Sequence, residues 1–60
     1  MKEPTIEELE ITIKYMQNPH AYGYNEGVMA LTAIMYCKHI GITPKELLEK
    51  KRIQYLTLKN

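Results

Sequence analysis

The longest apolar stretch of the chain, Val28–Cys37, limits the fold more than any other feature. Thr32 is its only polar residue, and no charged residue lies between Glu26 and Lys38. At helical angles this stretch is apolar on almost every side, as in a helix that neighbouring elements cover. The stretch is too short to cross a bilayer, so it predicts a core helix and no membrane span.

Residues typical of helix boundaries lie N-terminal to this stretch. Thr5 and Glu8 have the spacing of a capping box, and Pro19 pushes the residue before it out of the helical region. These signals predict a first helix over residues 5–17. Its apolar residues recur at helical spacing and form one inward stripe, which comprises Ile6, Leu9, Ile13 and Met16.

Residues typical of helix boundaries also mark where the second and third helices begin and where the second ends. Asn25 is the expected N-cap of the second helix and Gly41 its left-handed C-terminal residue, which predicts a helix over residues 25–40. Gly27, early in this helix, indicates close packing against a tyrosine of the preceding loop.

Thr43 as N-cap, Pro44 and a capping-box Glu46 predict a third helix over 43–58. Residues 52–58 also alternate partly like a strand, but a single strand has no pairing partner within the chain.

These elements predict one all-α domain over residues 1–60, with three helices and a central, largely buried second helix. A chain of 60 residues buries only about 60% of its unfolded surface, so its stability is marginal. The single cysteine, Cys37, cannot form an internal disulfide and favours a reducing, cytoplasmic location. Association with another protein is therefore the expected additional source of stability.

Catalysis is not expected from this sequence. It has no phosphate-binding loop, no nucleophile motif and no serine. His20, His39 and Cys37 are too few and too poorly spaced for a closed zinc site, so neither a metal nor another cofactor is expected. Cys37 is predicted inside the core, where a thiol is usually inert.

The favoured hypothesis is a non-catalytic protein-interaction module, either a homodimer or a small inhibitor or adaptor of a larger protein. When the second helix is projected at 100° per residue, its inward arc comprises Met29, Ala30, Ala33, Ile34, Tyr36, Cys37 and Ile40. Three apolar residues fall outside this arc, among polar ones. The expected interface comprises Val28, Leu31, Met35, Lys38 and His39. The competing interpretation is that the third helix or the tyrosine-containing loop covers this face. The small size is also typical of proteins encoded by phages and other mobile elements.

A second contact surface is a weaker hypothesis. Ile11 and Tyr15 lie opposite the inward stripe of the first helix, and Tyr22 and Tyr24 flank a glycine in the loop. Tyrosines offer a flat face and a hydroxyl to a ligand or partner. The alternative for the two loop tyrosines is that they seal the end of the small core.

The alternative function is DNA binding. Residues 33–52 resemble a helix-turn-helix unit, because Cys37, Ile40, Ile42 and Leu47 have the expected spacing around Gly41. Lys50 stands where that motif has an apolar residue. The surface facing the major groove would present Thr43, Lys45, Leu48, Glu49 and Arg52, with Lys51 beside it. A leucine and a glutamate are poor phosphate neighbours, so DNA binding is not favoured.

Overall fold

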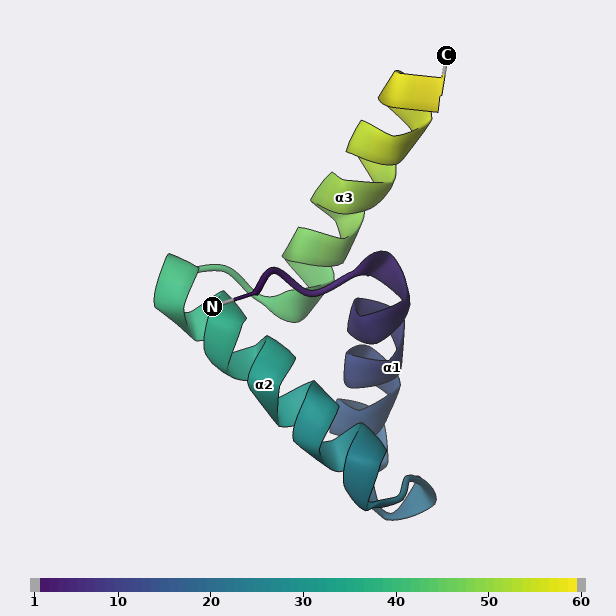
Figure 1. Ribbon diagram of the computed structural model, residues 1–60, viewed down its shortest axis with the longest axis vertical. Coiled ribbons are helices and arrows are strands. Elements are labelled where there is room, and N and C mark those ends of the chain that lie inside the picture. Colours follow the sequence, from purple (N-terminus) through teal and green to yellow (C-terminus); the bar gives the residue numbers. More distant parts are fainter. Residues whose placement is uncertain (1, 60) are drawn as a thin grey trace.

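The computed structural model describes residues 2–59, which form three α-helices and one short 3₁₀ turn. The elements are α1 (Ile6–Gln17), η1 (Pro19–Ala21), α2 (Tyr24–Ile40) and α3 (Pro44–Lys59). Figure 1 shows α1 and α2 side by side, with α3 extending away from them. The expected small all-α domain of three helices is confirmed.

The starts of α1 and α3 follow from local side-chain bonds. The Glu8 amide donates to Thr5 Oγ1 at 3.1 Å, and the Thr5 amide donates to Glu8 Oε1 at 2.8 Å. At α3, the Glu46 amide donates to Thr43 Oγ1 at 3.1 Å. These bonds satisfy amides that a helix start leaves without intrahelical partners. The caps predicted at Thr5 and Thr43 are confirmed.

The predicted start of α2 is wrong by two residues. The N-cap is Gly23, and Asn25, the predicted N-cap, lies in the first turn of the helix. Glu26 explains the earlier start, because its Oε1 accepts the Gly23 amide at 3.0 Å. The loop before α2 also contains η1, which the sequence did not predict.

The end of α2 is the one expected. Gly41 has a φ of 77°, in the left-handed region. The Ile42 amide then donates to the Cys37 carbonyl oxygen at 2.9 Å, the long bond of a Schellman motif. This turn redirects the chain into α3.

The core lies where all three helices meet, and α1 contacts both other helices. Ala30 and Ala33 are buried on the inner side of α2, and their small side chains allow α1 to approach closely. The central cluster comprises Leu9, Cys37, Leu47 and Leu48. The central position of α2 and the burial of its inner side are therefore confirmed.

Three residues differ from the expected core pattern. Met16 and Ile40 were expected inside, but both are about half exposed. Thr12 is instead fully buried, and its hydroxyl donates to the Glu8 carbonyl oxygen at 2.6 Å. This local bond satisfies a polar group that would be costly to bury alone.

The last turns of α3 extend beyond the core. The chain is helical through residue 59, so the strand alternative for residues 52–58 is wrong. Ile53, Leu56 and Leu58 are exposed. Figure 1 shows this end of α3, in yellow, standing away from α1 and α2.

Candidate functional site

The outer face of α2 carries a line of exposed apolar side chains. Tyr24, Val28, Leu31 and Met35 are 84, 46, 52 and 58% exposed. Their spacing of four, three and four residues places them on one side of the helix, as in the seam of a coiled coil. We call these four residues the outer stripe. Neither α3 nor the tyrosine-containing loop removes it from solvent.

Polar residues border the outer stripe. Thr32, Lys38 and His39 are all exposed. The Thr32 hydroxyl donates to the Val28 carbonyl oxygen at 2.9 Å, so this hydroxyl is satisfied within α2. The five residues predicted for the interface therefore share one exposed side of α2. An apolar centre with a polar rim is the usual anatomy of a protein-binding surface.

A hollow of about 260 Å³ lies beside the N-terminal half of the outer stripe. A Cβ atom added to Gly27 would lie 3.4 Å from the Tyr15 ring, an ordinary van der Waals contact, so the Tyr15 ring of α1 packs next to this glycine of α2. Close packing at Gly27 was expected, but the tyrosine comes from α1 and not from the loop. The hollow is lined by Tyr15, Pro19, Tyr22, Gly23, Tyr24, Gly27, Val28 and Leu31.

The four residues predicted as a second contact surface do not form one separate surface. Ile11, Tyr15 and Tyr22 are half-buried. The Tyr15 and Tyr22 rings lie 6.4 Å apart between centroids and are inclined by 55°, which is typical of a tilted aromatic pair. Tyr24 is highly exposed and belongs to the outer stripe. Tyr22 therefore adjoins the outer stripe, and Tyr24, which was expected in the loop, is part of it.

The residues predicted to contact DNA are only partly available. Thr43 and Lys45 are exposed, but Leu48 is 5% exposed and points into the core. Lys51 forms an ion pair with Glu3. Arg52 Nη2 lies 2.7 Å from Glu10 Oε2. Two of the basic groups thus face carboxylates of the same chain.

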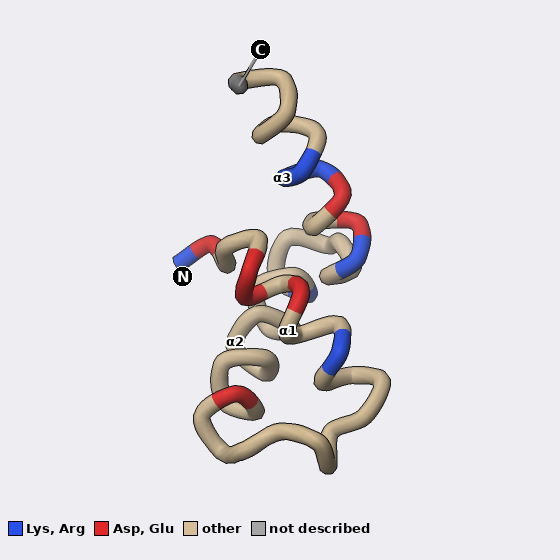
Figure 2. Tube along the Cα trace, turned by 90° about the vertical axis from the view of Figure 1, so that its right-hand side faces the viewer, with Lys and Arg blue, Asp and Glu red and all other residues tan. Residues whose placement is uncertain are grey.

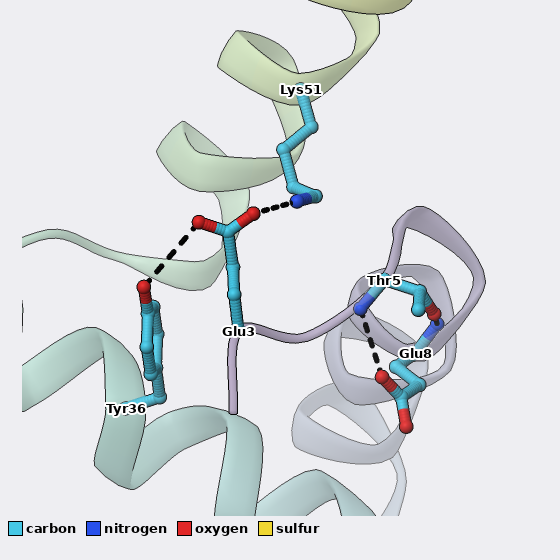
Figure 3. Close-up of polar contacts among 5 residues, drawn as sticks. All are labelled: Glu3, Thr5, Glu8, Tyr36 and Lys51. Atoms are coloured by element: carbon cyan, nitrogen blue, oxygen red, sulfur yellow. Dashed lines mark hydrogen bonds and ion pairs between the residues drawn. The ribbon is translucent and has the colours of Figure 1, made fainter. Parts of the chain in front are cut away.

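Glu3 links the N-terminal segment to two helices. Figure 3 shows its carboxylate between Lys51 of α3 and Tyr36 of α2, whose hydroxyl donates to Glu3 Oε1 at 3.4 Å. The hydrogen bond from Lys51 and its charge hold the pKa of Glu3 below the usual value, with a smaller contribution from Tyr36. No short motif indicates this contact, because it joins residues far apart in the chain.

A groove of about 390 Å³ runs between α1 and α3. It carries charges of both signs, with Glu10 and Glu49 near Lys14, Lys45 and Arg52. Figure 2 shows the same mixture, with blue and red segments close together on α1 and the first half of α3. This groove therefore lacks the single-sign field that selects an anionic or a cationic ligand.

Two further features concern chemical reactivity, and a third concerns membrane crossing. Within residues 2–59, no group of three or more histidine, cysteine or acidic side chains is placed to hold a metal ion. Burial raises the pKa of the Cys37 thiol, which favours its protonated and less reactive form. In the same part of the chain, no helix combines the length and apolarity that a bilayer crossing requires.

Comparisons of this chain with protein-family models, with curated proteins and with solved structures found no match. The outer stripe and its surroundings are therefore the features of this chain that bear on its function.

Proposed function

We propose that this protein is a non-catalytic interaction module that binds another protein chain through the outer stripe of α2. The observation that carries the proposal is the exposure of Val28, Leu31 and Met35 in one line, each about half exposed on a well-formed helix. A contiguous apolar surface with a polar rim is unfavourable in water and becomes favourable when a partner covers it.

The size of the chain supports the same proposal. The small central cluster of this fold supplies limited stability, and a bound partner adds stability to the folded state by mass action. One suitable partner is a second copy of this chain. The other is a larger protein, which this chain would inhibit or link to a further protein as an adaptor. DNA binding has less support, because Lys51 and Arg52 face Glu3 and Glu10.

Photo-crosslinking in cells that produce the protein tests this proposal. A photoreactive phenylalanine analogue placed at Leu31 should form covalent adducts with the bound protein after irradiation. The matched control carries the same analogue at Lys50, which is exposed on α3. Adducts at residue 31 and none at residue 50 are expected. The absence of protein adducts at residue 31 would contradict the proposal. The mass of an adduct shows whether the bound partner is a second copy of this chain or a larger protein.

A further inference from the structure

We infer that the partner on the outer stripe is a second copy of this chain, packed antiparallel with its two-fold axis near Leu31. This inference rests on the proposed function and specifies its partner. It depends on a projecting side chain and a matching hollow that occur on the same helix face.

The hollow has the form of a coiled-coil hole. In helix pairs of this type, each projecting side chain enters a space between four residues of the facing helix, spaced i, i+3, i+4 and i+7. Tyr24, Gly27, Val28 and Leu31 have this spacing, and all four line the hollow beside α2. Gly27 keeps the hollow open because it has no side chain, and the Tyr15 ring lies below it.

Met35 is the matching projecting side chain. It is 58% exposed and lies on the same stripe as the hollow. When two copies of α2 run antiparallel about Leu31, Met35 of each copy faces Gly27 and Val28 of the other. Methionine is flexible and fills irregular apolar spaces well. The two-fold symmetry repeats the contact, so two side chains fill two hollows.

Charge distinguishes the antiparallel from the parallel arrangement. The antiparallel pair places the Lys38 ammonium of one copy near the exposed ring of Tyr24 in the other, where a cation attracts the face of the ring. A parallel pair would place Lys38 against Lys38, and like charges in an interface are unfavourable. Antiparallel helices also align their dipoles favourably.

The orientation is tested by disulfide cross-linking of the full chain. Leu31→Cys should form a disulfide-linked dimer with itself because it lies at the axis. Met35→Cys alone should not, but a mixture of Val28→Cys and Met35→Cys should form a mixed dimer, which mass spectrometry identifies. The parent chain is the control, since its one cysteine, Cys37, is buried and should not cross-link. Efficient self-linking of Met35→Cys would indicate a parallel pair and overturn the inference.

The fit between Met35 and the hollow is tested by sedimentation equilibrium over a dilution series. Met35→Lys should weaken the dimer about tenfold or more, because the hollow would receive a charged group. Ile53→Lys is the matched control on the exposed end of α3 and should leave dimerisation unchanged. Equal dimer dissociation constants for Met35→Lys and the parent would overturn the inference.

Gly27→Ala should narrow the hollow without destabilising the single chain. The added methyl group lies at the limit of ordinary contact with Tyr15, so the folded chain should accept it. Dimerisation should weaken while helicity is kept.

A parent chain that is monomeric at every concentration would overturn the second-copy inference. Residue-31 photo-adducts with a different protein would then still support the proposed function, whereas their absence would contradict both.

Discussion

At the residue scale, Gly41 is the position where the backbone itself restricts the sequence. Its φ of 77° is unfavourable for side chains with a Cβ atom. Gly41→Ala should therefore lower the free energy of unfolding by about 1 kcal/mol. Gly41→Asn is the matched control and should cost less, because asparagine tolerates this conformation better. Chemical denaturation of the three proteins measures both differences. An unchanged midpoint for Gly41→Ala would contradict the left-handed end of α2.

Glu3 gives the chain a pH-dependent contribution to stability. Lys51 lowers the pKa of Glu3 in the folded state, so this contribution is complete above the unfolded-state pKa. It is lost as the pH falls through the lowered folded-state value. Because the pair is partly exposed, Glu3→Gln should cost at most about 1 kcal/mol at neutral pH.

The pH dependence is best measured as a double-mutant cycle. The free energies of unfolding of the parent, Glu3→Gln, Lys51→Gln and the double variant are measured at neutral pH and again in acid, below the lowered pKa of Glu3. A coupling energy at neutral pH that disappears in acid is expected. A coupling energy of the same size at both pH values would show that the ion pair is not its source.

Residue-scale features could be predicted from the sequence only where they are local. The caps at Thr5 and Thr43 and the turn at Gly41 depend on neighbouring residues, so short motifs identify them. The buried Thr12, the Tyr15 ring below Gly27 and the Glu3–Lys51 pair depend on how the helices pack. No spacing within one helix indicates them.

At the element scale, α2 separates its apolar residues into two sides with different uses. Ala30, Ala33 and Cys37 face the core, whereas Leu31 and Met35 face solvent. Helical periodicity predicted this division correctly. It could not predict how far the other helices extend around α2, because that depends on their packing. Ile40 illustrates the limit, since it was assigned to the inward arc and is 47% exposed.

The exposed end of α3 should contribute little to the stability of the domain. A chain that ends at Arg52 keeps Leu47, Leu48 and both ion-pairing residues of α3. Its thermal unfolding midpoint should therefore remain close to that of the full chain. A chain that ends at Glu46 is the control and should not fold, because it lacks both core leucines. Unfolding of the chain that ends at Arg52 would show that Ile53, Leu56 and Leu58 are buried in solution.

At the scale of the whole molecule, a small core is combined with the outer stripe of α2 and with further exposed apolar side chains at the end of α3. The described chain exposes 4683 Å². A standard interface covers about 800 Å² per partner, which is roughly one sixth of that surface. One helix face supplies only part of this area, so we expect a dimer that dissociates on dilution. Figure 1 shows α2 along one edge of the molecule, where a second helix has access.

The most direct test of the outer stripe as a dimer interface compares the solution mass and helicity of the parent chain with those of Leu31→Glu. The parent mass should rise with concentration towards twice the chain mass of 7.0 kDa. Leu31→Glu should keep its circular dichroism spectrum and stay at one chain mass. Loss of the helical signal in Leu31→Glu would show that Leu31 belongs to the core. A folded variant that still dimerises like the parent would show that the outer stripe is not the contact surface.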